Sequence, residues 1–568
     1  MRTTKWVHYH TYDEYYDFTK ELQNFEDFGD TSIDVHLSFN TETRTAYYVL
    51  VLNNDARVEP GTIDELMAVA RRDPRIAAVG GTWLASSAGT AAAMSESGRP
   101  MAMASHTWLL FICGGAATAA MYNVLTVGER ECSIQRRHQK VLEESPSPGV
   151  APAMRTAMEA AAIALARAIG YRNAGTVEFV ATGSEFFFLE MNTRLQVEHP
   201  VTECITGLDL VEQMIRVAAG EKLTFGQDDV KRDGWAIECR INAEDPFRNF
   251  LPSTGRLVRY QPPATQLAQG QVTLAGAAYE GGQFGGVRVD TGVYEGGEIP
   301  MFYDSMIAKL IVHGSDRNDA IAKMRAALNA FVIRGINSNI PFQAALLAHP
   351  RFVSGEFNTG FIAEHYGKGF FAEDVPHHDP NFLFALAAFV RRKSRERAAS
   401  LTGQLPGYDV KVGQDYTVIE LGKGGENRYV DVHVDDFPGQ HGVAVIRVDD
   451  KNYAIQSNSR LNDINIVGTV NGQPFTAQVE RGTGKNSLAL QVQHNGKRMD
   501  ALVVSRRMAE LHRLMPFKAP PDLSKFVLSP MPGLLVDVSV QPGQKVQAGE
   551  RVAVIEAMKM ENVLLATQ

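Results

Sequence analysis

The sequence predicts a multidomain protein of the α+β class, with helices and strands together in its centre and mostly β structure toward its C-terminus. Three observations lead to this prediction. The chain has 568 residues, a length typical of about three to five domains. An apolar helix pattern over 153–169 is followed by two strand patterns. Residues 408–504 contain many short β runs separated by Gly, Asn and Asp turns.

The elements outside that β-rich stretch follow from apolar periodicity and capping signals. Gly170 marks the end of the helix over 153–169, and Ser315 is the expected N-cap of a helix over 316–331. Thr182-Gly183 predicts a turn between two strands. The other expected elements are strands over 46–52, 176–180 and 186–190 and helices over 63–72 and 382–400.

The stretch 408–504 is predicted to be a small antiparallel β domain, a barrel. Asn471-Gly472 and Asn495-Gly496 each lie between strand-like runs, and Asn-Gly is a strong signal for a two-residue hairpin turn. Many short strands joined in this way are typical of a barrel. Pro516–Pro521 then predicts a stiff linker.

The composition excludes several classes of protein. Lys and Arg number 56 and Asp and Glu 65, so the net charge is −9, whereas nucleic acids and acidic membranes bind basic proteins. The N-terminus has neither a signal-peptide nor a transit-peptide pattern. Four cysteines without a CxxC pair predict no disulfide framework and no structural zinc site, which suits a reducing compartment.

One uncharged stretch, residues 100–128, is long enough to be weighed as a membrane span. Its centre consists of Gly, Ala and Thr rather than Leu, Ile and Val. Such residues give little drive for insertion, so the composition favours a segment that does not span a membrane.

The most informative stretch for chemistry is 189–200, Leu-Glu-Met-Asn-Thr-Arg-Leu-Gln-Val-Glu-His-Pro. In an extended chain alternate residues share a face. One face would then carry a row of polar side chains: Glu190, Asn192, Arg194, Gln196 and Glu198. Glu178 on the preceding strand would lie beside Glu190, and with Asn192 they would form an oxygen ligand set suited to magnesium on phosphates. A structural polar ladder is the alternative.

A cationic cluster lies upstream of this stretch, at Arg136, Arg137, His138 and Lys140, and Glu143 and Glu144 follow it. A charge run is usually a solvated face. Near a magnesium site, the same cations would suit an anionic substrate or a triphosphate. The residues alone leave both interpretations open.

These stretches resemble the second half of the ATP-grasp domain of the biotin carboxylases. Four motifs carry the resemblance in the order of that family: Gly-Glu-Arg-Glu-Cys-Ser-Ile-Gln-Arg-Arg-His-Gln-Lys at 128–140, Glu-Met-Asn-Thr-Arg-Leu-Gln-Val-Glu-His-Pro at 190–200, Glu-Cys-Arg-Ile-Asn-Ala-Glu-Asp at 238–245 and Phe-Tyr-Asp-Ser-Met-Ile-Ala-Lys at 302–309. The resemblance implies an ATP-dependent ligase in which ATP and bicarbonate form carboxyphosphate, whose carbon dioxide is captured by biotin.

The C-terminal part resembles the rest of a biotin-dependent acyl-CoA carboxylase α chain, closest to the propionyl-CoA carboxylase α chains. Residues 529–533 and 556–562 resemble the biotin attachment domain, in which the lysine between two methionines, Lys559 here, carries biotin. The β domain and the segment 510–516 resemble the linking domain that docks the α chain onto carboxyltransferase β subunits.

The resemblance implies a role for each matching residue. Glu178, Glu190 and Asn192 would hold Mg²⁺ or Mn²⁺ on the phosphates of ATP. Glu198 would deprotonate bicarbonate, which Lys140, Arg194, Gln196 and the backbone of Val197 would hold. Arg240 would stabilise the biotin enolate, and Gln135 and His138 would contact the nucleotide.

The resemblance also implies domain boundaries. We expect the second half of the ATP-grasp domain at 127–227 and the biotin carboxylase C-terminal domain at 228–370. The linking domain, a helix plus an antiparallel β-barrel, is expected at 380–515, and a partial all-β biotinyl domain at 526–568.

Residues 1–126 stay unassigned, because they depart from the family pattern. They contain no Gly-rich loop followed by Arg or Lys. The strand 46–52 with Asn53-Asn54-Asp55 resembles part of the nucleotide-sugar glycosyltransferases, although a strand, turn and helix cap give the same pattern. The chain also ends nine residues after Lys559. We therefore expect truncation at both ends, and no useful ATP turnover by this chain alone.

The expected partners are bicarbonate, ATP and a carboxyltransferase β subunit that handles the acyl-CoA, with no nucleic acid and no membrane. The expected location is the bacterial cytoplasm, or the mitochondrial matrix in a eukaryote. A 3-methylcrotonyl-CoA or broad acyl-CoA carboxylase α chain is an alternative, because acyl specificity lies in the β subunit. A non-catalytic fragment that keeps only partner docking, and a glycosyltransferase-like activity of residues 1–126, also stay open.

Overall fold

The computed structural model divides the chain into two compact units. The first comprises residues 1–238, 268–284 and 355–365, and the second comprises 239–267, 285–354 and 366–568. The structure describes residues 33–40, 45–52, 105–114, 123–137, 139–183, 185–265, 286–301, 304–404, 407, 410–436, 443–482, 488–516, 526–530, 533–557 and 560–566.

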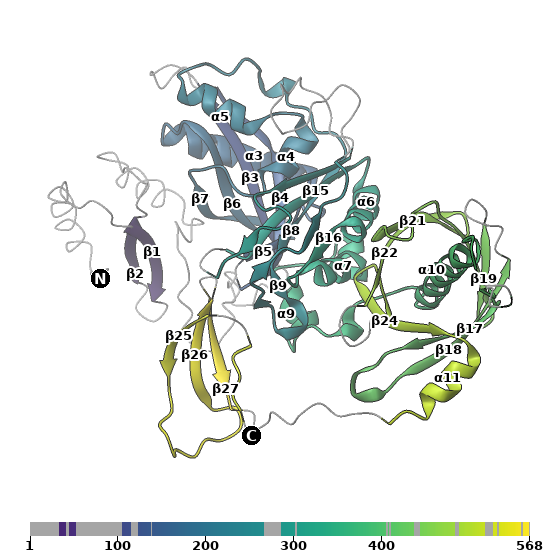
Figure 1. Cartoon of the computed structure of the whole chain (residues 1–568). Coiled ribbons are helices and arrows are strands. Elements are labelled where there is room, and N and C mark those ends of the chain that lie inside the picture. The colour runs from purple at the N-terminus through teal and green to yellow at the C-terminus, as the bar shows by residue number, and fades with distance from the viewer. Residues whose placement is uncertain are drawn as a thin grey trace. The chain divides into compact units, whose positions relative to one another are not determined.

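The first unit is built on antiparallel strands in the order β5-β4-β3-β6-β7 (Figure 1). Their bounds are β3 Ser105–Gly114, β4 Asn123–Arg136, β5 Gln139–Ser145, β6 Asn173–Thr182 and β7 Glu185–Asn192. The helices of this unit are α3 Pro152–Ala168, α4 His199–Thr206, α5 Leu210–Ala218, the 3₁₀ turn η2 Gln227–Asp229 and α9 Phe361–Tyr366. β1 Ile33–Asn40 and β2 Thr45–Leu52 form a separate two-stranded sheet.

Different helices cover the two faces of the five-stranded sheet. On β4, Glu129 accepts a hydrogen bond of 2.6 Å from Arg155 of α3, whereas its neighbour Arg130 donates at 3.2 Å to Thr202 of α4. Successive strand residues point to opposite faces. The α3 face is an apolar core that includes Met158 and residues of β6, and the α4 face carries the polar groups described below.

Several predictions for this unit are confirmed. The helix expected over 153–169 is α3, and Gly170 follows it in the left-handed region, with φ +62°. The expected strands are β2, β6 and β7, and Gly183 lies in the turn between the last two. The helix expected over 63–72 lies outside the described residues. The predicted boundary at residue 127 falls within β4.

The uncharged stretch 100–128 contains strands. β3 pairs with β4 on one side and with β6 on the other. In the part of the chain that the structure describes, no helix is both long enough and apolar enough to cross a membrane. Cys132, Cys204 and Cys239 are buried free thiols.

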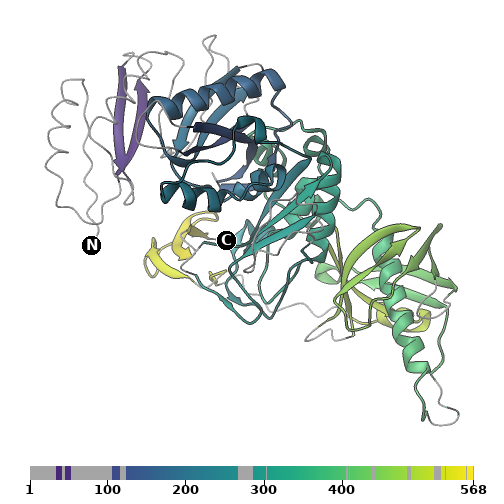
Figure 2. The ribbon, with the colours of Figure 1, turned by 90° about the horizontal axis from the view of Figure 1, so that it is seen from above.

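The second unit contains a closed antiparallel barrel of eight strands around helix α10 Asn381–Ala399. The strands are β17 Asp415–Glu420, β18 Arg428–Asp436, β19 Ala444–Val448, β20 Lys451–Gln456, β21 Asn465–Val470, β22 Gln473–Arg481, β23 Leu490–His494 and β24 Lys497–Val504. Eight successive residues of α10, 382–389, are buried with the inward side chains of the strands. A helix that is apolar on all sides must be buried on all sides, and Figure 2 shows α10 passing between the barrel strands.

The barrel and its hairpin turns confirm the prediction for 408–504. Asn471 and Gly472 have φ of +49° and +80° and join β21 to β22, and Asn495 and Gly496 have φ of +49° and +78° and join β23 to β24. Positive φ at both central positions is the requirement of a type I′ turn, which Asn-Gly meets at little cost.

The remaining elements of the second unit precede and follow the barrel. They are β8 Trp235–Asn242, which begins in the first unit, β9 Glu244–Asp245, η3 Pro246–Arg248, β10 Leu251–Pro252, β11 Gly255–Arg256, β12 Arg259–Gln261, β13 Val287–Thr291, β14 Glu298–Ile299, β15 Met306–Gly314, α6 Arg317–Ala330, β16 Val332–Arg334, α7 Ile340–Ala348, α8 Pro350–Ser354, η4 Ala372–Asp374, η5 Lys423–Gly425 and α11 Arg506–Arg513. A C-terminal sheet has β25 Leu534–Val538, β26 Arg551–Ala557 and β27 Met560–Leu565.

One cap in this unit differs from the prediction. The N-cap of α6 is Asp316, whose side chain accepts from the Asp319 backbone N–H at 2.9 Å, and not Ser315. Ser315 instead donates its backbone N–H to the Asp319 carboxylate at 2.9 Å. Asp and Ser cap helices about equally well, so two adjacent candidates left the start of the helix ambiguous by one residue.

A half-buried histidine pair generates a prediction about pH. His377 Nε2 and His494 Nδ1 are 2.9 Å apart, and His494 also packs on Phe382 with ring centroids 5.1 Å apart. Burial lowers the pKa of His377 to about 4, with Asp379 opposing the shift, and burial together with His377 and Arg325 lowers the pKa of His494 to about 3. Below pH 6.5 the unfolded chain therefore binds protons that the folded barrel does not bind.

We expect the free energy of unfolding of the barrel to be constant above pH 7 and to fall on acidification. Between pH 7 and pH 5 each histidine should cost on the order of 2 kcal/mol. Urea unfolding followed by circular dichroism would show a smaller loss in His494→Gln. A matched control, His433→Gln, changes a histidine that pairs with Asp415 on the barrel and should retain the loss. An equal acid loss in His494→Gln would contradict the assignment.

Candidate active site

The β6–β7 hairpin places two carboxylates side by side. Its register pairs Glu178 with Glu190 directly, and Thr176 with Asn192. This is the arrangement that the sequence predicted from the turn at Thr182-Gly183. Glu178 is 2 % exposed, and both glutamates lie on strands that the sheet holds in fixed register.

An amide group joins the two carboxylates. Asn192 Nδ2 donates to Glu178 Oε1 and, at 3.0 Å, to Glu190 Oε1. Burial raises the pKa of Glu178 to about 10, and the charge of Glu190 adds to the rise while Lys140 opposes it. The pair is therefore short of positive charge, which is the condition that a bound cation relieves.

The predicted ligand set of Glu178, Glu190 and Asn192 is thus brought together. Within the described ranges, no group of three or more His, Cys, Asp and Glu side chains is placed to hold a metal ion. The predicted set differs from such a group because its third member is an amide. Two carboxylates and one amide are hard oxygen donors of the kind Mg²⁺ takes when phosphate and water oxygens complete its coordination.

The prediction of an extended chain through residue 198 is wrong. β7 ends at Asn192, residues 193–196 are irregular, residues 197–198 form a turn, and α4 begins at His199 with Pro200 in its first turn. Proline favours that position, because its fixed φ suits a helix start and its missing N–H would have no helical partner there. The alternation of polar residues past Asn192 therefore does not describe a strand face. Arg194 is exposed, whereas Gln196 and Glu198 turn inward and are 3 % and 1 % exposed.

The turn carries Glu198 to a cation from the neighbouring hairpin. Lys140, at the start of β5, forms a buried ion pair with Glu198 Oε1, and their side chains are 10 % and 2 % exposed. Glu198 is also the N-cap residue of α4 but makes no capping bond with its side chain. Its carboxylate is thereby directed to Lys140, while the helix N-terminus adds favourable potential for negative charge.

Arg130 is a site residue that the sequence analysis missed. It is fully buried, with 0 % exposure. Its guanidinium donates to Gln196 Oε1 at 2.5 Å and to Thr202 Oγ1 at 3.2 Å, and it lies 4.0 Å from Glu198 Oε1. A basic residue between Glu129 and Glu131 resembles a solvated charge pattern, so its place in a family motif is the only signal that could have pointed to it.

The interpretation of Glu143 and Glu144 as part of a solvated charge run is also wrong. Both are 0 % exposed, and Glu144 accepts from Trp235 Nε1 at 2.7 Å. Glu144 also pairs in register with Glu131. Burial raises the pKa of Glu131 to about 7, while hydrogen bonds from Ser133 and Ser147 oppose the rise. These acids therefore belong to the interior of the β4–β5 hairpin.

The other predicted residues are placed as follows. Gln135 lies opposite Lys140 across the hairpin and donates to the Cys132 carbonyl at 2.9 Å. Val197 is half-buried in the turn before α4. Arg240 lies on β8 in the second unit, and its carbonyl accepts from Asn339 and Gln343 at 2.8 and 3.0 Å. His138 and Lys559 lie outside the described residues.

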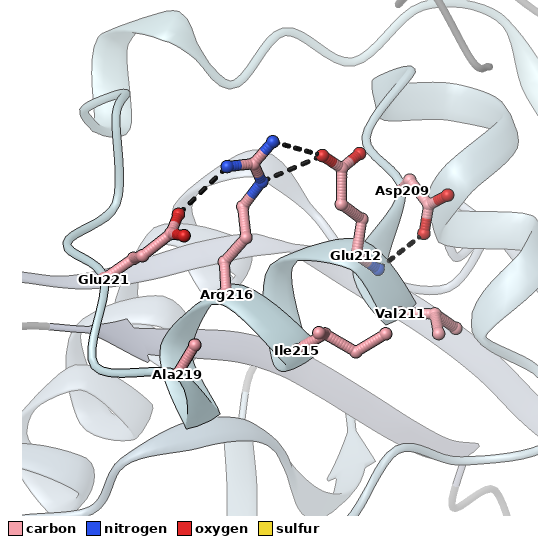
Figure 3. Close-up of a pocket in the computed structure, with 7 residues that line it drawn as sticks. All are labelled: Asp209, Val211, Glu212, Ile215, Arg216, Ala219 and Glu221. Atoms are coloured by element: carbon pink, nitrogen blue, oxygen red, sulfur yellow. Dashed lines mark hydrogen bonds and ion pairs between the residues drawn. The ribbon is translucent and has the colours of Figure 1, made fainter.

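A shallow pocket of about 420 Å³ lies along α5 and shares no residue with this cluster (Figure 3). Its charged groups are paired with one another. Arg216 bonds Glu212 at 2.8 Å and Glu221 at 2.9 Å, and Asp209 caps the helix. Val211 and Ile215 supply its apolar surface. The predicted chemistry therefore lies in the polar cluster and not in this pocket.

Four family models match the chain in succession. Residues 118–225 match "Carbamoyl-phosphate synthase L chain, ATP binding domain", and residues 238–364 match "Biotin carboxylase C-terminal domain". Residues 383–518 match "Propionyl-coenzyme A carboxylase BT domain", and residues 525–568 match "Biotin-requiring enzyme". The first match contains the polar cluster, and the last contains Lys559.

Curated relatives align over most of the chain. The propionyl-CoA carboxylase alpha chain of Ruegeria pomeroyi is 48 % identical over 453 residues, which is 78 % of this chain and 64 % of that protein. The mitochondrial propionyl-CoA carboxylase alpha chain of Homo sapiens is 40 % identical over 449 residues, 78 % of this chain and 58 % of that protein. The chain thus spans about three fifths of the length of these relatives.

Solved structures with similar sequences are biotin carboxylases. A biotin carboxylase–β,γ-ATP complex from Campylobacter jejuni is 42 % identical with a TM-score of 0.41, covering 46 % of this chain and 53 % of that one. The biotin carboxylase subunit of a pyruvate carboxylase is 33 % identical with a TM-score of 0.42, covering 62 % of this chain and 67 % of that one.

Glu190→Gln tests the oxygen cluster as a cation site. The change removes one of two charged ligands, so we expect Mn²⁺ affinity, measured by electron paramagnetic resonance of free Mn²⁺, to fall at least about tenfold. The metal-free protein should not lose stability, because the substitution also removes like-charge repulsion. Glu185→Gln, at the exposed start of the same strand, is the matched control. Equal Mn²⁺ affinity in the two variants would exclude Glu190 as a ligand.

Proposed function

We propose that this chain, which belongs to the family of biotin-dependent acyl-CoA carboxylase α chains, is the biotin carboxylase and biotin carrier subunit of a propionyl-CoA carboxylase. The observation that carries the proposal is the buried cluster in which two paired carboxylates, an amide and a Lys–Glu ion pair converge beside one hairpin. Because the chain spans about three fifths of its relatives, the activity is proposed for the site that this cluster helps to build.

The oxygen cluster fits a divalent cation. Glu178, Glu190 and Asn192 would hold Mg²⁺ or Mn²⁺, with the Asn192 amide turned so that its oxygen faces the ion. The cation, when bound with ATP, would neutralise charge on the phosphates. Glu178 is buried and Glu190 is half-buried, and the charge of Lys140 only partly opposes the rise in the pKa of Glu178. The two carboxylates would supply the negative charge that such an ion requires.

The ion pair fits a base and its substrate anion. Glu198 would take the proton of bicarbonate onto a carboxylate oxygen, and Lys140 would stabilise the charge on both. Gln196, Arg194 and the Val197 backbone would hold the bicarbonate oxygens. Burial of Glu198 and Gln196 limits competition from water, which strengthens each of these charge interactions.

The nucleotide, biotin and partner contacts complete the proposal. Gln135 and His138 would contact the nucleotide, and Arg240 would stabilise the biotin enolate. Biotin, attached at Lys559, would carry the carboxyl group between active sites. The barrel with α10 and α11 would dock onto a carboxyltransferase β subunit, which would bind the acyl-CoA. The matching relatives are bacterial and mitochondrial proteins, and we propose a cytoplasmic or matrix location accordingly.

Bicarbonate-dependent phosphate release with free biotin tests the carboxylase function. The assay compares this chain with a version whose residues 1–126 are replaced by the N-terminal half of a biotin carboxylase, which supplies a Gly-rich phosphate loop. We expect turnover in the second protein and far less in the first. In the active protein Glu198→Gln should lower kcat about 10²- to 10⁴-fold, the usual contribution of a general base.

The control for this assay is Glu185→Gln, which leaves the cluster intact and should keep full turnover. Absence of turnover in the replaced protein, or full activity in Glu198→Gln, would refute the proposed function. Equal turnover with and without the replacement would instead show that residues 1–126 already complete the site.

Biotin attachment is tested separately. Biotin ligase with biotin and ATP should label the chain in a streptavidin blot, and Lys559→Arg should abolish the label because arginine cannot form the amide bond to biotin. Lys545→Arg changes an exposed lysine of the same C-terminal segment and should keep the label. Persistent labelling of Lys559→Arg would place biotin on another residue.

A further inference from the structure

Arg130 holds a position that ordinary stabilisation does not explain well. Its side chain is fully buried, and burying a guanidinium costs several kcal/mol unless an ion pair compensates. Among the described residues its ion-pair partner is Glu198, whose Oε1 is 4.0 Å away. Its hydrogen-bond acceptors are neutral: Gln196 Oε1 at 2.5 Å, Thr202 Oγ1 at 3.2 Å and Thr176 Oγ1 at 3.5 Å.

The shortest of these bonds fixes the orientation of an amide. A guanidinium has only donors, so the Gln196 side chain must turn its oxygen toward Arg130. Its nitrogen then faces the other way, where Gln196 Nε2 donates to Glu178 Oε1 at 3.3 Å. The two ends of an amide are told apart by their hydrogen-bond partners. The exchanged form of Gln196 would present nitrogen to Arg130 and oxygen to the Glu178 carboxylate, which is unfavourable at both ends.

We infer that Arg130 is a positioning residue, which locks Gln196 so that its NH₂ group faces Glu178 and the interior of the cluster. The inference rests on the proposed function, in which Gln196 holds bicarbonate. Only the NH₂ end of that amide can donate to a bicarbonate oxygen. The hydrogen bonds of Arg130 go to Gln196 and two threonines and not to the carboxylates of the metal pair, so it acts through Gln196.

A purely structural role predicts a different outcome. Arg130 also ties β4 to β6 through Thr176 and to α4 through Thr202. If these ties were its whole function, its removal would lower stability and leave the Gln196 amide unchanged. A measurement on the amide itself therefore separates the two roles.

The test is the side-chain NH₂ resonance of Gln196 in the full-length chain labelled with ¹⁵N-glutamine, assigned by its loss in Gln196→Asn. Arg130→Met should remove the signal from its position in the unmodified protein, and Glu178→Gln should move it as well, since it changes the acceptor. Thr202→Val, which takes away another acceptor of the same guanidinium, should leave it in place. If Arg130→Met leaves the resonance where it was, the inference is overturned.

A second variant covers a failure to fold. Arg130→Lys keeps a buried cation but cannot reach Gln196 and both threonines at once, so it should displace the same resonance, and an unmoved resonance there would also overturn the inference. The signal requires no turnover, so it stays decisive even if the phosphate-release assay refutes the proposed function. Where that assay gives turnover, Arg130→Met should raise KM for bicarbonate about tenfold and change kcat less.

Discussion

Glu178 and Glu190 face each other across β6 and β7 on a buried side of the sheet, and the cluster around them is arranged to tolerate that repulsion. Two amides donate hydrogen bonds to Glu178 Oε1, Asn192 through Nδ2 and Gln196 through Nε2. Lys140 adds a positive field from the next hairpin and pairs with Glu198. Two carboxylates held so close destabilise the folded protein in the absence of a cation. Destabilising arrangements of this kind cluster at functional sites.

The sheet separates this chemistry from its supporting structure. Glu129 and Arg130 are adjacent, yet one bonds α3 and the other bonds α4. The α3 side combines an apolar core with the Glu129–Arg155 ion pair, so it stabilises the sheet without taking part in the cluster. The α4 side concentrates the polar groups of the cluster, which we propose bind ligands. The barrel of the second unit shows no such division, because its interior is filled by the apolar half of α10.

The parts of the fold that could be predicted are those set by local chemistry. Asn471-Gly472 and Asn495-Gly496 specify type I′ turns by conformational preference alone. The turn at Gly183 joins β6 to β7, and a shift of register between Glu178 and Phe179 then brings Glu178 opposite Glu190. The prediction of an extended chain over residues 193–198 was wrong because polar residues continue to alternate after the strand has ended. Pro200 favours the first turn of a helix, which is a local signal against a strand that continues to residue 198.

Burial is what the sequence could not show. Arg130, Glu143 and Glu144 read as surface charges because charged residues usually are solvated, and only the packing of α4 and of Trp235 against the hairpin reveals their environment. The buried guanidinium of Arg130 donates to threonine and amide oxygens that lie more than forty residues away in sequence. Such contacts have no periodic signature.

The central claim is that the β6–β7 hairpin holds a divalent cation. Anomalous diffraction from crystals of the full-length chain soaked in Mn²⁺ tests it most directly. We expect a manganese peak bound by oxygens of Glu178, Glu190 and Asn192, with the Asn192 amide reversed from its metal-free orientation. Manganese bound at other residues while these three side chains keep their metal-free hydrogen bonds would contradict it.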